Sequence, residues 1–177
     1  MSKLKTVIKV AGGVVCSIPL IIALVIAGGQ VHTSQQGLEL IGNAEGCRRD
    51  PYQCPSDVLT VGIGSTAASG NAILRGKIYS DQEIADRWQK DLIIAERCVN
   101  QYANGRNMPQ GAFDALTSIT FNVGCNRLRK STLFKLAQTG YSHTMCGEFN
   151  KWVYAGGKKL SGLVKRRAKE TALCLQG

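Results

Sequence analysis

Acidic residues, histidine, proline and aromatic residues are all scarce in this sequence of 177 residues. Only 12 Asp and Glu oppose 22 Lys and Arg, so the net charge is +10 and anionic partners are expected. Charge alone does not choose among nucleic acid, acidic lipid and an acidic cell-wall polymer. The two histidines are isolated and no His–Cys pair has metal-ligand spacing, so we expect no metal site and no cofactor. Repeats are absent as well, and 44% hydrophobic residues predict one folded domain and exclude a disordered chain.

Cysteine, in contrast, is abundant, and its count of seven is odd. In an oxidising compartment, at least one thiol must stay outside the intrachain disulfides or pair between chains. The four cysteines of the C-terminal half are expected to form two structural disulfides. Four cysteines allow three pairings, and the sequence does not choose among them. These four residues are Cys98, Cys125, Cys146 and Cys174.

The first thirty residues contain a charge-free run that predicts export. Residues 10–31 are 22 uncharged residues in succession, and as a helix they would span about 33 Å, enough to cross a bilayer core. Lys3, Lys5 and Lys9 precede the run, which keeps the N-terminus in the cytoplasm and sends the remainder outward. Glycines, a proline and polar residues dilute the run, so its insertion into a membrane should be weak.

This run has two interpretations, a cleaved signal peptide and an uncleaved, marginal membrane helix. Val25-Ile26-Ala27 would be the cleavage site under the first, and we favour the second. We therefore assign residues 1–30 to a signal-anchor segment and residues 31–36 to a polar linker. Export of residues 37–177 also disfavours nucleic acid as the anionic partner, since no nucleic-acid-binding motif is present.

The remainder of the chain has an α+β pattern. Apolar residues from Leu38 to Ala44 predict a short helix that ends at Glu45, and residues 46–70 carry the Gly and Pro spacing of turns and short antiparallel strands. A capping box, Ser80 to Glu83, begins a helix that continues to about Tyr102. Further helices are expected at residues 109–123, 131–138, 143–154 and 162–173. These elements predict a small sheet-bearing lobe and a larger helical lobe.

Glu45 is the first candidate for catalysis, because a carboxyl at the end of an apolar helix can be partly desolvated and serve as a proton donor. Eight residues separate it from Cys54, and five more separate Cys54 from Thr60. Four ordered blocks accompany this spacing: Thr60-Val-Gly-Ile-Gly64, Phe121-Asn-Val-Gly124, Trp152-Val-Tyr-Ala-Gly-Gly157, and Gly162-Leu163 with Arg166-Arg167 and Glu170. From about residue 37 to the end, the sequence thereby resembles the phage lysozyme family, muramidases that cleave bacterial peptidoglycan.

The resemblance implies a lysozyme-like fold with the active-site cleft between the two lobes. It implies that Glu45 is the general acid and that Thr60 holds the attacking water. Cys54 occupies the position that most members fill with Asp, so its thiol would activate water, stabilise positive charge or, in a less favoured alternative, form a covalent intermediate. Residues 37–177 would then be the catalytic domain.

Three cysteines near the N-terminus and the candidate site allow a disulfide exchange. A Cys47–Cys54 disulfide would consume the candidate catalytic thiol, and Cys16 could attack Cys47 to release Cys54 once the N-terminal run has left the membrane. This arrangement is similar to the signal-arrest-release subgroup of phage endolysins, which are secreted inactive, tethered, and later freed. The resemblance implies that regulation; the spacing itself indicates only that the exchange is feasible.

We therefore expect a monomeric endolysin that hydrolyses the β-1,4 bond between N-acetylmuramic acid and N-acetylglucosamine. It would be tethered to the host inner membrane through residues 10–31, with its catalytic domain in the periplasm, and then be released there. Two alternatives stay open: a lytic transglycosylase, and a peptidoglycan-binding module without activity. A basic C-terminal cluster is either a solvated helix face or a contact for carboxylated stem peptides. Its members are Lys158, Lys159, Lys165, Arg166, Arg167 and Lys169.

Overall fold

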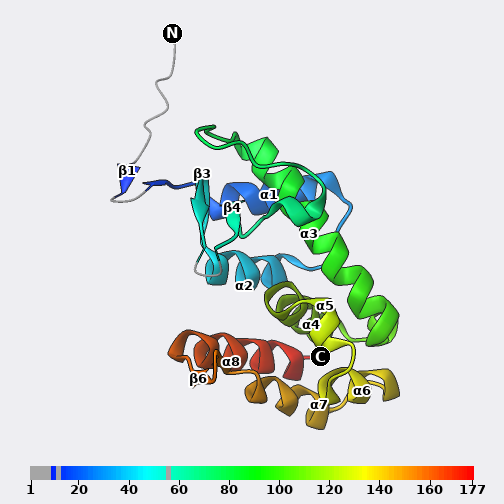
Figure 1. Cartoon of the computed structure of the whole chain (residues 1–177). Coiled ribbons are helices and arrows are strands. Elements are labelled where there is room, and N and C mark those ends of the chain that lie inside the picture. The colour runs from blue at the N-terminus through cyan, green and yellow to red at the C-terminus, as the bar shows by residue number, and fades with distance from the viewer. Residues whose placement is uncertain (1–8, 11–12, 55–56) are drawn as a thin grey trace.

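The computed structural model describes residues 9–10, 13–54 and 57–177, and a long helix, α3, connects its two lobes (Figure 1). Lys3 and Lys5, on which part of the export prediction rests, lie outside the described residues. The elements of the N-terminal lobe are β1 (Lys9–Val10), β2 (Gly13–Val14), α1 (Ile18–Gly28), α2 (Gln35–Glu45), β3 (Arg48–Gln53), β4 (Leu59–Gly62), the 3-10 helix η1 (Ala67–Ser69) and the start of α3 (Asp81–Tyr102). The elements of the helical lobe are η2 (Gly105–Asn107), α4 (Gln110–Val123), α5 (Cys125–Leu128), α6 (Thr132–Thr139), α7 (His143–Gly147), η3 (Glu148–Lys151), β5 (Tyr154–Ala155), β6 (Lys158–Lys159) and α8 (Ser161–Leu175). The predicted α+β architecture with small sheets is thus confirmed.

The N-terminal charge-free run does not form one helix of 22 residues in this structure. Its helix, α1, has 11 residues, because Ser17 caps its N-terminus, Pro19 lies in its first turn and Gly29 ends it with φ +62°. Val14 lies in a strand, and positions 11 and 12 are outside the described residues. Within the described part of the chain, no helix is both long and apolar enough to cross a membrane.

Helix α1 instead contributes to the core of the N-terminal lobe. Ile21 and Val25 are at most 1% exposed and belong to the same buried cluster as Leu38, Ile41 and Trp88. In Figure 1, α1 (blue) lies beside the β3–β4 hairpin and the first turns of α3. Burial of several branched aliphatic side chains contributes about 1.5–3 kcal/mol each. The N-terminal segment is therefore an integral part of this fold.

The linker between α1 and α2 is held by two buried carboxylates, one from α3 and one from α4. Glu96 of α3 accepts hydrogen bonds from the amides of His32 and Thr33, at 2.8 and 2.7 Å, and from the Thr33 hydroxyl. Asp114 of α4 accepts the Ser34 amide at 3.0 Å. Gln35 and Gln36, which the sequence placed in the linker, already form the first turn of α2. These contacts fix where α2 begins, and Glu45 is its last residue.

The long helix and the antiparallel strands follow the sequence prediction. Ser80 and Glu83 form the expected capping box, and α3 ends at Tyr102. Strands β3 and β4 pair antiparallel, with Tyr52 opposite Thr60 and an irregularity in register before that pair. The predicted helix over residues 143–154 is wrong after Lys151. There, Gly156 and Gly157, at φ +56° and +75°, make the tight turn of the β5–β6 hairpin.

Candidate active site

Glu45 lies where α2 meets the β3–β4 hairpin, and two other segments surround its carboxyl. Gly46, at φ +72°, ends the helix and turns the chain into β3. A Cβ on Gly64 would stand 3.5 Å from both Glu45 Oε2 and Phe121 Cε1, so the Gly64 backbone packs close to this carboxyl. Gly62 packs in the same way against Ile84 of α3. The two glycines of the Thr60–Gly64 motif therefore permit close packing of the strand against α3 on one side and against Glu45 on the other.

The second oxygen of Glu45 is held by an arginine from the opposite end of the chain. Arg166 Nη1 donates to Glu45 Oε1 at 2.6 Å, and only 7% of the Arg166 side chain is exposed. Its remaining donors reach Glu170 Oε1 at 3.2 Å and the carbonyl of Ser118 at 3.2 Å. The ion pair fixes Oε1 and leaves Oε2 on the side of Gly64. The sequence contained Arg166 within a family block but did not indicate that it pairs with Glu45.

A buried charge network supports Arg166 from behind. Glu170 also pairs with Arg167 and accepts the Ser118 hydroxyl at 2.6 Å, while Arg167 Nε donates to the carbonyl of Trp152 at 3.0 Å. The side chains of Arg167 and Glu170 are both 0% exposed. Together with Glu45, the network holds two positive and two negative charges, so burial leaves no uncompensated charge.

Glu170→Gln is therefore expected to lower the free energy of unfolding by about 3–5 kcal/mol, because Arg167 would remain buried without its carboxylate. Urea denaturation measures this loss. Glu148→Gln is the matched control, since Glu148 pairs with Lys151, whose side chain is 69% exposed. That control should cost less than about 1 kcal/mol. Equal losses in the two variants would contradict the role assigned to the network.

Thr60 and Cys54 lie on the β3–β4 hairpin that follows Glu45. Thr60 is 4% exposed, and its hydroxyl donates to the Val58 carbonyl at 3.1 Å, so the lone pairs of that hydroxyl are available to accept a hydrogen bond from a water. Cys54 follows β3 directly, and its amide donates to the same carbonyl at 3.0 Å. The Val58 carbonyl therefore holds both candidates.

Tyr52 lies near Glu45, Cys54 and Thr60, and the sequence did not predict a role for it. It faces Thr60 in the strand register. Burial raises the pKa of the Tyr52 phenol, and the negative charge of Glu45 raises it further; Arg48 lowers it in part, and Cys54 adds a smaller increase. Tyr52 thus lies within electrostatic reach of both candidate groups, and it stays protonated and able to donate a hydrogen bond at neutral pH.

The cysteines form three disulfides within the described residues. These are Cys16–Cys47, Cys98–Cys125 and Cys146–Cys174. The two in the helical lobe resolve the pairing that the sequence left open. The first joins the segment before α1 to the turn between Glu45 and β3, and the amide of Cys16 also donates to the Cys47 carbonyl at 3.3 Å. Cys54 is outside these three disulfides.

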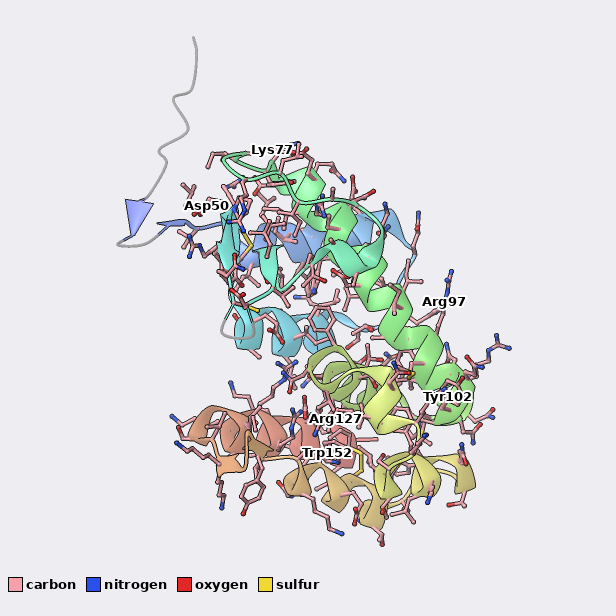
Figure 2. All side chains as sticks on the ribbon, viewed as in Figure 1. Asp50, Lys77, Arg97, Tyr102, Arg127 and Trp152 are labelled. Atoms are coloured by element: carbon pink, nitrogen blue, oxygen red, sulfur yellow. A yellow bond between two sulfur atoms is a disulfide. The ribbon has the colours of Figure 1, made fainter. Side chains whose placement is uncertain are left out.

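Asp50, beside that disulfide, also contacts the N-terminal segment (Figure 2). Its carboxylate accepts the amide of Val14 at 2.6 Å and pairs with Arg48 at 2.5 Å. The hydrogen bond from Arg48 lowers the pKa of Asp50. Strand β3 is therefore attached to the N-terminal segment by a covalent bond and by a charge-assisted hydrogen bond.

Ser65 and Asp91 complete the wall beyond Gly64. Ser65 donates to Asp91 Oδ2 at 2.5 Å, and burial raises the pKa of this aspartate. A neutral hydroxyl therefore bonds the carboxyl there. A depression of about 320 Å³ extends from Gly64 and Asp91 to Phe121, and another of about 510 Å³ is lined by Glu45 itself. The candidate acid is thus accessible from a concave surface, as a polymer substrate requires.

The basic C-terminal cluster is not one surface. Arg166 and Arg167 are buried in the network behind Glu45, whereas the four lysines of the cluster are exposed.

Elsewhere in the helical lobe, the Arg127 guanidinium lies 5.8 Å from the centre of the Trp152 ring (Figure 2). In the described ranges, no group of three His, Cys, Asp or Glu side chains is placed to hold a metal ion.

Comparisons with known proteins confirm the lysozyme-like fold that the sequence predicted. The phage lysozyme family model matches residues 42–170. The SAR-endolysin of Escherichia phage P1 is 46% identical over 177 residues, and the match covers 94% of each chain. The crystal structure of the active form of P1 phage endolysin Lyz superposes with a TM-score of 0.87 at 46% identity, covering 94% of this chain and 97% of that one.

The secreted inactive form of the same P1 endolysin is less similar. Its TM-score is 0.59, and the match covers 82% of this chain and 97% of that one, at the same 46% identity. The structure described above therefore resembles the active form.

Proposed function

The chain belongs to the phage lysozyme family, and we propose that its Glu45 site hydrolyses the β-1,4 bond between N-acetylmuramic acid and N-acetylglucosamine in peptidoglycan. The class of activity, a muramidase-type glycoside hydrolase of a phage endolysin, follows from this family and from the SAR-endolysin relative. The position of the Glu45 carboxyl is the observation that supports its assignment as the catalytic acid. One oxygen pairs with Arg166 at 2.6 Å, and the other faces Gly64 at the edge of a depression.

In the proposed reaction, the substrate meets the form of Glu45 that carries a proton on Oε2, and this proton passes to the glycosidic oxygen as the bond to the anomeric carbon breaks. A water held by Thr60 adds to that carbon, and the proton that the water loses passes to the Cys54 thiolate or to solvent. The Thr60 hydroxyl and the Cys54 amide both donate to the Val58 carbonyl, which supports their acting on the same water. Arg166 fixes the orientation of Glu45, and the Tyr52 phenol nearby stays protonated.

Regulation by thiol–disulfide exchange is the second part of the proposal. In the tethered protein, a Cys47–Cys54 disulfide blocks the catalytic thiol. After release, the Cys16 thiolate attacks the Cys47 sulfur, the Cys16–Cys47 bond forms, and Cys54 departs as a thiolate. The Cys16–Cys47 disulfide and the similarity to the active form of the P1 endolysin support this as the final state.

The proposed localisation of the protein also depends on its N-terminal segment. The SAR-endolysin relative implies anchoring in the membrane followed by release. We assign the anchor to residues 10–31 in the host inner membrane, with the catalytic domain in the periplasm both before and after release. The enzyme is proposed to act there as a monomer, with peptidoglycan as its only required partner.

The products of digestion test hydrolysis against the transglycosylase alternative. Purified peptidoglycan treated with the active protein should yield muropeptides with reducing N-acetylmuramic acid ends, each heavier by one water than an anhydro product. Mass spectrometry of the soluble fragments distinguishes the two. Anhydro products would assign the site to a transglycosylase, and wall binding without any soluble fragment would favour the module without activity.

A further inference from the structure

The segment that precedes α1 lies antiparallel along one edge of β3. Val15 pairs with Arg48, and the amide of Cys16 donates to the Cys47 carbonyl at 3.3 Å. In an antiparallel pair, a step forward on one strand is a step back on the other, so the residue after Val15 faces the residue before Arg48. These two residues are Cys16 and Cys47, and their Cα atoms are 5.3 Å apart. The backbone register therefore brings the two cysteines together.

Asp50 of β3 holds this segment in its register (Figure 2). Its carboxylate accepts the Val14 amide at 2.6 Å and pairs with Arg48 at 2.5 Å. The Arg48 guanidinium in turn lies close to Gly13, because a Cβ on this glycine would stand 2.4 Å from Arg48 Nη2. Charge-assisted hydrogen bonds are stronger than neutral ones. The Arg48–Asp50 pair is thus a binding site for Gly13 and Val14 that is built from noncovalent contacts.

The Cys47–Cys54 disulfide of the proposed inactive form is incompatible with β3 in its present conformation. Cys47 precedes this strand and Cys54 follows it. Six residues at about 3.3 Å each keep the two ends of the strand well apart, whereas a disulfide requires Cα atoms within about 7 Å of each other. β3 must therefore lose its extended form when that disulfide closes. The contacts along its edge stabilise only the form in which the disulfide is open.

The exchange also has to select one disulfide among three. Cys16, Cys47 and Cys54 can form three different pairs, and only the Cys16–Cys47 pair releases Cys54 for catalysis. In the register described above, Cys16 lies beside the start of β3, whereas Cys54 lies beyond its end. Pairing of the segment with β3 therefore favours Cys47 as the partner of Cys16 and opposes a bond to Cys54.

We propose that Asp50 is a positioning residue for the exchange: by binding Val14 it places the segment along β3 and makes Cys16–Cys47 the stable disulfide. The inference rests on the exchange described under the proposed function. In that step the Cys16 thiolate attacks the Cys47 sulfur, the bond between these two forms as the Cys47–Cys54 bond breaks, and Cys54 leaves as a thiolate. One disulfide replaces another, so no oxidant or reductant is consumed.

Asp50→Ala tests this selection in the released full-length protein, purified without detergent. The protein is incubated with a catalytic amount of glutathione until its disulfides equilibrate, quenched with acid and mapped by mass spectrometry. The ratio of Cys16–Cys47 to the other two pairs should fall about tenfold or more, because the lost hydrogen bond involves a charged group. Asp50→Asn keeps an acceptor and should lower the ratio less. Asp86→Ala is the matched control, since Asp86 is exposed on α3 and accepts a hydrogen bond from Gln82. It should leave the ratio unchanged.

Val14→Pro removes the donor of the same hydrogen bond. It should lower the ratio by a similar factor, and Asp50→Ala/Val14→Pro should be affected no more than the weaker of the two single variants. For each variant, the activity per molecule that carries Cys16–Cys47 should stay within about twofold of the wild type. This equality separates a role in positioning from damage to the active site.

Three results would overturn the role of Asp50: an unchanged ratio in Asp50→Ala, an equal fall in Asp86→Ala, or additive losses in the double variant. Wild-type protein that is active while it keeps Cys47–Cys54 would contradict the proposed exchange, and this inference with it. Wild-type protein that forms Cys16–Cys47 but releases no soluble muropeptides would instead contradict the proposed hydrolase function, while the disulfide ratios still decide the role of Asp50.

Discussion

A Cys16→Ser variant is expected to be exported but to leave cell walls intact. Without the Cys16 thiol nothing displaces Cys54 from Cys47, so the proposed catalytic thiol stays oxidised. The variant also lacks the disulfide that joins the segment before α1 to the turn after Glu45 across a separation of 31 residues. The decrease in turbidity of permeabilised Gram-negative cells measures activity, and fractionation of the producing cells measures export.

Two further preparations separate the chemistry of the thiol from the stability of the fold. Mild reductant should restore activity to Cys16→Ser, because it reduces Cys47–Cys54 directly. Cys16→Ser/Cys47→Ser should be active without reductant, because Cys54 then has no partner for the inhibitory disulfide. Full lysis by Cys16→Ser alone would refute the exchange. If the double variant were inactive both with and without reductant, the Cys16–Cys47 bond would be needed for folding of the site and not only for release of a thiol.

The sequence predicted the part of the site that is contiguous in the chain. Glu45, Cys54 and Thr60 lie within 16 residues, and the spacing that revealed them is the spacing of one helix end and one hairpin. It did not predict the pairing of Arg166 with Glu45, because the two are separated by 121 positions and only the packing of α8 against α2 and α4 brings them together. The same limit explains why Arg166 and Arg167 were grouped with exposed lysines: along the chain they are neighbours, yet they lie on the buried face of α8.

The N-terminal run was harder to interpret because its residues suit both a membrane and a protein core. An apolar helix suited to a bilayer also suits a protein core, and composition does not distinguish them. In this structure Ile21 and Val25 are buried, whereas Leu20 and Ile26 on the same helix are each 45% exposed. A helix that only served the core would carry polar residues on its outer face. The exposed aliphatic residues support the proposal that this segment is also a membrane anchor.

Glu45→Gln is expected to lower the rate of wall hydrolysis by about 10²–10⁴-fold, the usual contribution of a positioned general acid. The amide has nearly the shape of the carboxyl but no proton of suitable acidity to give to the glycosidic oxygen. Arg166 keeps Glu170 as a partner, so the variant should remain folded. The rate of release of soluble muropeptides gives the activity, and co-sedimentation with purified walls shows whether binding persists.

Glu39→Gln is the matched control, because Glu39 is exposed on the same helix and its carboxylate accepts a hydrogen bond only from Gln35 in the described structure. Its activity should equal that of the wild type. A Glu45→Gln variant that binds walls but does not cut them would separate recognition from chemistry and assign proton donation to this residue. If instead the variant kept more than about a tenth of the wild-type rate, the expected contribution of a general acid would be missing. The Arg166–Glu45 pair would then be a structural tie between α8 and α2, and the proton would have to come from another group in the cleft.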